Sequence, residues 1–160
     1  FYSNESWRLY YLRAISFERS NQWEQAEKDL LDSLKINPNS PDVLNYLAYG
    51  WLERDIKIDS ALEMLKKAYD SNPDSYYILD SLAWAYYKKN ELDKAAELME
   101  KVINMVPGEV ISLDHLADIY FAMKRKREAR FLWKQALDLA EPEDVIFDSL
   151  KKKLELDYAG

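Results

Sequence analysis

Apolar side chains recur along the chain at spacings of three and four residues, the spacing of one face of an α-helix. Prolines and short polar clusters interrupt this pattern at regular intervals. Only 3 glycines and 5 prolines occur in 160 residues, and both are poor helix formers, so their scarcity favours an all-helical chain. The pattern predicts helices over residues 5–19, 23–36, 41–54, 59–71, 75–89, 92–105, 110–123, 126–139 and 143–157.

Two sets of alanines recur every 34 or 35 residues, which predicts four copies of one helical hairpin. A small side chain lets two antiparallel helices approach closely, and a bulky residue three or four positions later fills the flank on the same face. Prolines that follow helical runs keep the same period. The alanines are Ala14, Ala48, Ala83 and Ala117 in first helices and Ala26, Ala61, Ala95 and Ala129 in second helices, and the prolines are Pro38, Pro73, Pro107 and Pro142.

Polar residues at the predicted helix starts suggest how the helices are capped. Asn21 and Asn90 are each followed three residues later by a carboxylate, which predicts that both asparagines cap second helices. Ser40 is predicted to cap a helix whose first residue is Pro41, where a missing N–H costs nothing. The segment RDIKIDSA is one residue longer than its counterparts, so we expect a longer turn in the second hairpin.

The two ends of the chain differ. Residues 143–157 lack the alanine register, and an apolar stripe opposite three lysines predicts a terminal capping helix with one buried and one solvated face. No such cap precedes the first hairpin, and the chain does not begin with methionine, so we expect a fragment of a longer chain whose upstream part contacts Phe1, Tyr2 and Trp7. The stripe is Val145, Ile146, Leu150, Leu154 and Leu156, and the lysines are Lys151, Lys152 and Lys153.

The alanine, aromatic and proline positions resemble the signature of the tetratricopeptide repeat (TPR) family over about residues 7–142. The first repeat departs from it at Arg13 and Ser33. The resemblance implies an all-α, right-handed TPR superhelix, an α-solenoid of four hairpins plus a capping helix. It implies one array over 1–160, with repeats at about 7–40, 41–75, 76–109 and 110–142. The third repeat supplies Leu79, Leu82, Ala83, Tyr86, Ala95, Met99, Val102 and Pro107.

Several runs, among them VLNYLAYGWLE and YILDSLAWAYYK, are also similar to TPR proteins of Gram-negative bacteria. Relatives in that group include envelope lipoproteins that act as adaptors and bring substrates to C-terminal-processing proteases. This resemblance implies a bacterial scaffold. A periplasmic or envelope-associated location and a cytoplasmic one both stay open.

The family resemblance also implies where a partner binds, because positions 2, 5, 9 and 12 of each first helix usually face a concave groove. These positions are aromatic and acidic here, which favours a basic or apolar segment of another protein. Trp51 and Trp133 are expected in the core instead. The predicted groove residues are Tyr11, Asp42, Asn45, Tyr49, Tyr77, Asp80, Trp84, Tyr87, Asp114, Asp118 and Phe121, and the remaining groove positions hold Arg8, Ile15, Glu18, Leu52 and Ile111.

Charge and residue types argue against other functional classes. The 29 acidic and 22 basic residues give a net charge of −7, which disfavours nucleic acid as the main ligand. The chain has no cysteine, no glycine-rich phosphate loop and no apolar run of the ~20 residues that cross a membrane. His115 is the only histidine and is expected on the surface or in the packing. We therefore expect no enzyme activity, no cofactor and no metal.

One basic cluster, KRKREAR at residues 124–130, stands out in this acidic chain. We interpret it as a solvated turn of the fourth hairpin, with a nucleic-acid or acidic-lipid patch as the alternative. Two functions follow from the sequence. The first is a protein-binding scaffold, and the alternative is a structural element that self-associates by stacking through its uncapped N-terminal end.

Overall fold

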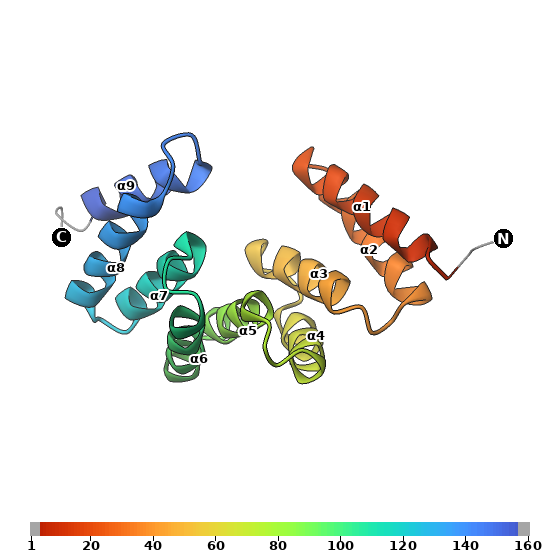
Figure 1. Ribbon diagram of the computed structural model, residues 1–160, viewed down its shortest axis with the longest axis horizontal. Helices are drawn as coiled ribbons and strands as arrows, with labels where there is room; N and C mark the ends of the chain where they lie inside the picture. Colours follow the sequence, from red (N-terminus) through yellow and green to blue (C-terminus); the bar gives the residue numbers. More distant parts are fainter. Residues whose placement is uncertain (1–3, 157–160) are drawn as a thin grey trace. The chain divides into compact units, whose positions relative to one another are not determined.

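The computed structural model describes residues 4–156, and all regular secondary structure in that range is helical (Figure 1). The predicted all-α class is confirmed, and each helix end lies within two residues of its predicted position. The helices are α1 (Ser6–Arg19), α2 (Trp23–Ile36), α3 (Pro41–Glu53), α4 (Ile58–Ser71), α5 (Tyr76–Lys88), α6 (Leu92–Met105), α7 (Val110–Ala122), α8 (Lys126–Leu139) and α9 (Val145–Leu156).

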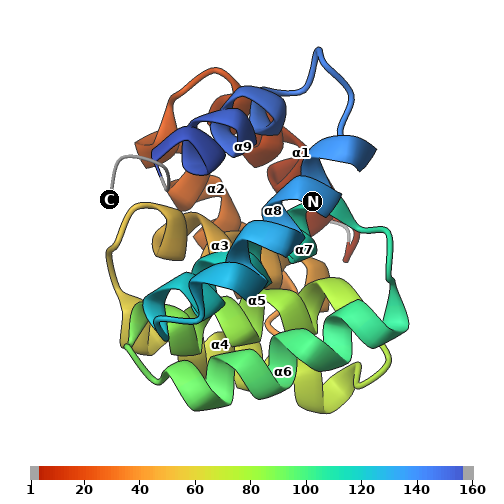
Figure 2. The ribbon, with the colours of Figure 1, turned by 90° about the vertical axis from the view of Figure 1, so that its left-hand side faces the viewer.

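The helices form two compact units, with the boundary in sequence between Pro73 and Asp74. In the first unit α1 pairs with α2 and α3 pairs with α4, while α2 also contacts α3. In the second unit α5 pairs with α6 and α7 with α8, while α9 packs against α8 (Figure 1 and Figure 2). Consecutive helices therefore form four hairpins, as the repeat predicts. A single array over the whole chain stays a prediction.

The eight repeated alanines are all completely buried, which confirms their predicted place at the helix crossings. Each hairpin is closed by large apolar residues on the flanks of the alanines. Trp51 and Trp133 are buried in this register, so the prediction that both belong to the core is confirmed.

The turns inside the hairpins differ from the predicted capping arrangement. The N-caps of α2 and α6 are Gln22 and Glu91, and neither side chain makes a capping hydrogen bond. Asn21 and Asn90 precede these caps and adopt left-handed backbone, with φ of 58° and 62°. The predicted asparagine caps were wrong because asparagine also tolerates the left-handed conformation that ends the preceding helix.

The end of α1 shows how such a turn is closed. The Gln22 N–H donates to the Phe17 carbonyl over 2.8 Å and the Asn21 N–H to the Glu18 carbonyl over 2.9 Å, the two bonds of a Schellman motif. These bonds satisfy carbonyls that the helix itself leaves without partners. The longer turn before α4 is present as predicted. It contains two residues with left-handed backbone, Asp55 and Lys57, with φ of 53° and 48°. Lys124, in the turn before α8, is also left-handed, with φ of 67°.

The helix α3 starts where the sequence predicts, but the predicted capping hydrogen bond is absent. Pro41 occupies the first turn and Ser40 is the N-cap, as predicted. The Ser40 side chain makes no capping hydrogen bond, however. The fixed φ of proline and the extended backbone of Ser40 therefore start this helix.

The capping helix α9 is present, but the prediction for its two faces was partly wrong. Leu150 is buried, whereas Val145 is 92% exposed and Leu156 is exposed as well. Lys153 does not lie on the solvated face. It follows Leu150 by three residues, so both side chains project from the same face of the helix. The predicted contacts of Phe1 and Tyr2 lie outside the described residues.

Gly50 of α3 sets a close approach between α3 and α2. A Cβ at this position would come within 2.2 Å of the Trp23 indole, over which the Arg54 guanidinium lies at 4.0 Å. Gly50→Ala should therefore lower the free energy of unfolding by about 1–2 kcal/mol, although alanine is the better helix former. Urea titration of both proteins measures the difference. Gly108→Ala is the matched control, because a Cβ there meets nothing within 4 Å, and equal effects of the two substitutions would contradict this packing.

Candidate functional site

A buried polar cluster joins α5 to α7 in the second unit. One oxygen of the Asp80 carboxylate accepts a hydrogen bond from the Ser112 hydroxyl at 2.5 Å, and the other lies 2.7 Å from Nδ1 of His115. All three side chains are buried. Asp80 was predicted to face the groove, and the structure shows both of its carboxylate oxygens bonded inside the unit.

An aromatic stack adjoins this cluster. The Trp84 ring lies parallel to the His115 ring, with 4.1 Å between centroids, and Tyr87 stacks on Trp84 at 4.4 Å. Trp84 is only 6% exposed, while Tyr87 is half-buried. His115 therefore acts as a packing residue, which is one of the two places expected for it.

Lys153 of α9 bridges the other two predicted acidic residues of the second unit. Its Nζ lies 2.7 Å from Asp114 and 2.9 Å from both oxygens of Asp118, which also accepts a hydrogen bond from the Trp133 indole at 3.2 Å. Burial and the neighbouring Asp114 charge raise the pKa of Asp118, against the opposing effect of Lys153. Burial disfavours the charged ammonium, but the two carboxylates outweigh it and raise the pKa of Lys153.

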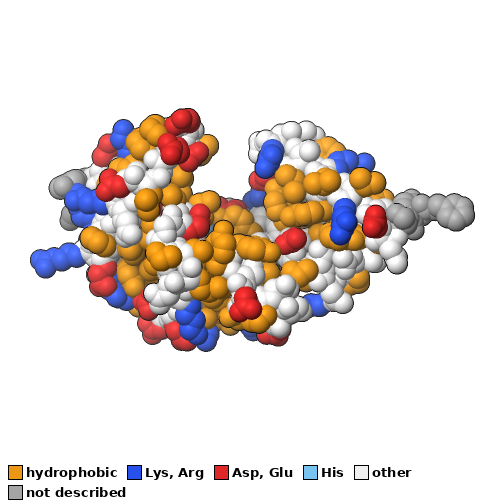
Figure 3. All heavy atoms as spheres, viewed as in Figure 1, with side chains coloured by type: hydrophobic (Ala, Val, Ile, Leu, Met, Phe, Trp, Pro, Cys, Tyr) orange, Lys and Arg blue, Asp and Glu red, His pale blue; other side chains and the backbone are white. Residues whose placement is uncertain are grey.

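Two rows of apolar side chains remain accessible on the first helices of the second unit. Tyr77 of α5 and Ile111 of α7 occupy the same repeat position and are 42% and 49% exposed. Ten residues further along each helix, Tyr87 is half-buried and Phe121 exposed. We call these four residues the first-helix surface. Figure 3 shows that hydrophobic side chains reach the molecular surface among charged ones.

The predicted residues of the first unit differ in their burial. Tyr11 contacts Tyr46 edge to face, with 5.8 Å between ring centroids, and Asp42 is exposed at the start of α3. Tyr49 and Asn45 are half-buried. The side-chain oxygen of Asn45 is buried and has no hydrogen-bond partner within residues 4–156.

The hydrogen bonds of the Asp80, Ser112 and His115 cluster differ from those of a nucleophilic serine site. Ser112 donates to Asp80 rather than to His115, so serine and histidine do not form a nucleophile and base pair. Residues 4–156 contain no group of three His, Asp or Glu side chains placed to hold a metal ion. In the same range, no helix has the length and hydropathy that crossing a bilayer demands.

Tyr120 gives the second unit a measurable alkaline transition. Its hydroxyl donates to Glu100 at 2.6 Å, and burial together with this bond raises the pKa of Tyr120 to about 12. A raised folded pKa means that the stabilisation is complete below the unfolded value of about 10 and is lost as the pH rises through about 12. Urea unfolding from pH 9 to 12 should show a steeper loss of stability for the wild type than for Tyr120→Phe, and parallel curves would contradict the assignment.

Comparison with known proteins finds similarity over part of this chain. The family profile described as tetratricopeptide repeat matches residues 57–113. The TPR repeat-containing protein PA4667 of Pseudomonas aeruginosa is 35% identical over 88 residues. Residues 57–113 therefore match the tetratricopeptide-repeat family. That match covers 55% of this chain and only 15% of the relative, so the chain spans a small part of the length of the curated protein it resembles.

Solved structures share the TPR fold at low sequence identity. The thermophilic TPR protein TTC0263 of Thermus thermophilus has a TM-score of 0.84 at 20% identity, over 95% of this chain and 82% of that protein. MamA from Desulfovibrio magneticus RS-1 has a TM-score of 0.72 at 20% identity, over 89% and 79% of the two chains. At these identities the likeness shows the fold. TPR domains generally mediate protein–protein interaction and are typically non-catalytic.

Proposed function

We propose that this TPR protein is a scaffold that holds a segment of another protein against the first helices of its repeats. The observation that carries the proposal is the first-helix surface. Tyr77 and Ile111 stand in equivalent positions on neighbouring helices and both remain about half exposed. Large side chains of this kind, held on rigid helices, provide contact area at a low cost in conformational entropy.

The internal bonds of the acidic residues bear on the chemistry of the partner. Asp80 is bonded to Ser112 and His115, while Asp114 and Asp118 share Lys153, so these three carboxylates already have donors from this chain. We therefore propose a predominantly apolar partner segment.

Peptide display tests the proposal. A library of random peptides is selected on the intact protein, and the dissociation constants of the enriched peptides are measured against a Tyr77→Ser, Ile111→Ser, Phe121→Ser variant. Loss of one well-packed anchor should weaken binding about 30-fold, so the triple variant should bind far more weakly than that. Leu31→Ser, Met105→Ser, Leu139→Ser is the control, because it removes three exposed apolar residues from second helices. Equal affinity for both variants would refute binding at the first helices.

One observation favours the assembly alternative. Leu9 and Leu12 of α1 are both exposed at the start of the first unit. Another copy, or helices upstream in a longer protein, could cover this apolar surface. Sedimentation at increasing concentration tests self-association. Dimers that disappear in Leu9→Glu, Leu12→Glu would favour stacking of copies, and a monomer at all concentrations would rule it out for this chain.

A further inference from the structure

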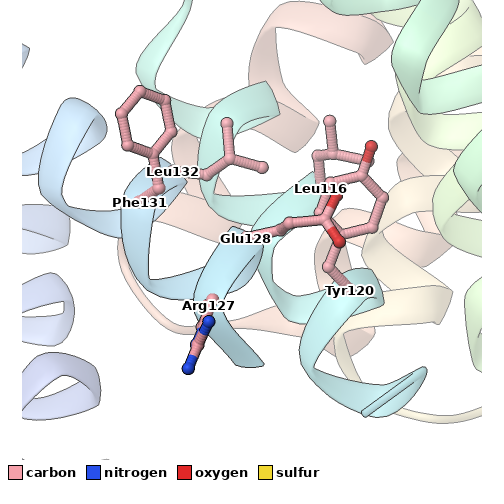
Figure 4. Close-up of a pocket in the computed structure, with 6 residues that line it drawn as sticks. All are labelled: Leu116, Tyr120, Arg127, Glu128, Phe131 and Leu132. Carbon is pink, nitrogen blue, oxygen red and sulfur yellow. The ribbon is translucent and has the colours of Figure 1, made fainter. Parts of the chain in front are cut away.

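The fourth hairpin carries a pocket that is separate from the first-helix surface. The pocket lies between α7 and α8 and has a volume of about 300 Å³ (Figure 4). Leu116 and Tyr120 line it from α7 and are buried, whereas Phe131 of α8 is 68% exposed. An exposed phenylalanine beside a hollow with a buried apolar lining is a surface that gains from being covered. The lining residues are Leu116, Tyr120, Arg127, Glu128, Phe131 and Leu132.

Basic residues are concentrated in the part of the sequence that supplies the α8 side of this pocket. Residues 124–134 contain six lysines and arginines and a single carboxylate, Glu128, in a chain of net charge −7. Arg125 binds that carboxylate with two hydrogen bonds, so Glu128 does not neutralise the other cations. Arg127 and Lys134 are exposed and have no carboxylate partner in the described part of the chain.

The geometry of α8 places charge and apolar surface side by side. Arg127, Phe131 and Lys134 follow one another at spacings of four and three, so they project from one face of the helix. In Figure 4, Arg127 extends away from the apolar side chains. Arg127 lines the pocket, and Lys134 lies on the same face of α8 as Arg127 and Phe131.

We propose that this pocket and the basic residues Arg127 and Lys134 form a second docking surface, for an acidic amphipathic segment of a partner protein. A leucine or phenylalanine of that segment enters the pocket against Leu116 and Leu132. Aspartate or glutamate side chains next to it pair with Arg127 and Lys134. This site goes beyond the proposed function, because its residues and the charge of its ligand differ from those of the first-helix surface.

The combination of features favours a peptide over a polyanion. RNA or an anionic membrane would use the cations but would leave the apolar pocket unfilled, and the net negative charge of the chain opposes a dense row of phosphates. A short acidic segment carries fewer charges and supplies the apolar side chain that the pocket accommodates. Charge complementarity and the pocket together point to this one ligand class.

The test uses a fluorescein-labelled helical peptide with leucine and phenylalanine four residues apart and glutamates between them, titrated with the intact protein and followed by anisotropy. We expect saturable binding that weakens at least tenfold in Phe131→Ser and at least tenfold in Arg127→Glu, Lys134→Glu. Lys151→Glu, Lys152→Glu should leave the affinity unchanged, because both lysines are exposed on α9 and neither lines the pocket. The peptide with glutamine for glutamate should bind more weakly.

Three results would overturn the proposal. One is the absence of peptide binding, and another is binding that Phe131→Ser leaves intact. The third is tighter binding of a single-stranded RNA or a phosphatidylserine vesicle than of the peptide, if that binding is lost in Arg127→Glu, Lys134→Glu but kept in Phe131→Ser. The Tyr77→Ser, Ile111→Ser, Phe121→Ser variant should retain the acidic peptide, so failure of the proposed function and failure of this docking surface are distinguishable.

Discussion

Trp133→Ala is expected to lower the free energy of unfolding by about 3–5 kcal/mol, the range for truncating a buried tryptophan. Trp133 of α8 is buried, four residues after the repeated alanine Ala129. The centroid of its ring lies 5.5 Å from that of Phe121. Its indole N–H also donates to Asp118 at 3.2 Å. The substitution therefore opens a cavity and removes one of the donors that stabilise a largely buried carboxylate.

Phe131→Ala is the matched control for this prediction, because it removes an aromatic ring from the same helix. Phe131 is exposed, so its loss should change stability by no more than about 0.5 kcal/mol. Urea unfolding of the three proteins, followed by far-ultraviolet circular dichroism, gives the comparison. Similar losses for Trp133→Ala and Phe131→Ala would show that the core of the fourth hairpin is wrongly assigned.

Asp80→Ala should be the most damaging change of a charged residue, with a loss of about 2–5 kcal/mol. The substitution leaves Ser112 and His115 buried with no acceptor where the carboxylate stood. Each buried polar group that loses its partner costs about 1–3 kcal/mol. The loss falls on the contact between α5 and α7, which also positions Tyr77 and Ile111.

Asp74→Ala serves as the control, since Asp74 is exposed just before α5 in the same unit. The double variant Asp80→Ala, Ser112→Ala should cost less than the sum of its single substitutions, because both remove the same bond. Urea unfolding of these variants measures the coupling. Additive effects would show that Asp80 and Ser112 are not coupled, and an Asp80→Ala loss as small as that of Asp74→Ala would show that the cluster contributes little to stability.

The fold could be predicted from the sequence because the same pattern of small and bulky residues recurs in four repeats. Ala83 and Ala95 are each one of four equivalent alanines, so an accidental match in one repeat cannot shift the register. Local packing at helical spacing determines the helix ends and the core tryptophans. Asn21 and Asn90 were misread because a turn between two helices is both the end of one and the start of the next, and the same residue suits either role.

The surroundings of the candidate residues were less predictable, because bonds between helices depend on how the hairpins stack. Asp80 looked accessible from its repeat position, yet Ser112 and His115 of the next hairpin take both of its oxygens. The partial burial of Lys153 could have been predicted, since Lys153 lies on the same face of α9 as Leu150. Its partners Asp114 and Asp118 lie more than 30 residues earlier in the chain, a distance at which helical periodicity gives no information.

The central claim, that the first helices hold a partner segment, is tested most directly by site-specific photo-crosslinking. A photoreactive amino acid replaces Ile111 or, as the control, Leu139 of α8, and both proteins are irradiated in the source cell. The account predicts an adduct with a different protein from position 111 and its absence from position 139. Adducts that form equally from both positions, only from Leu139, or only with a second copy of this chain would contradict it.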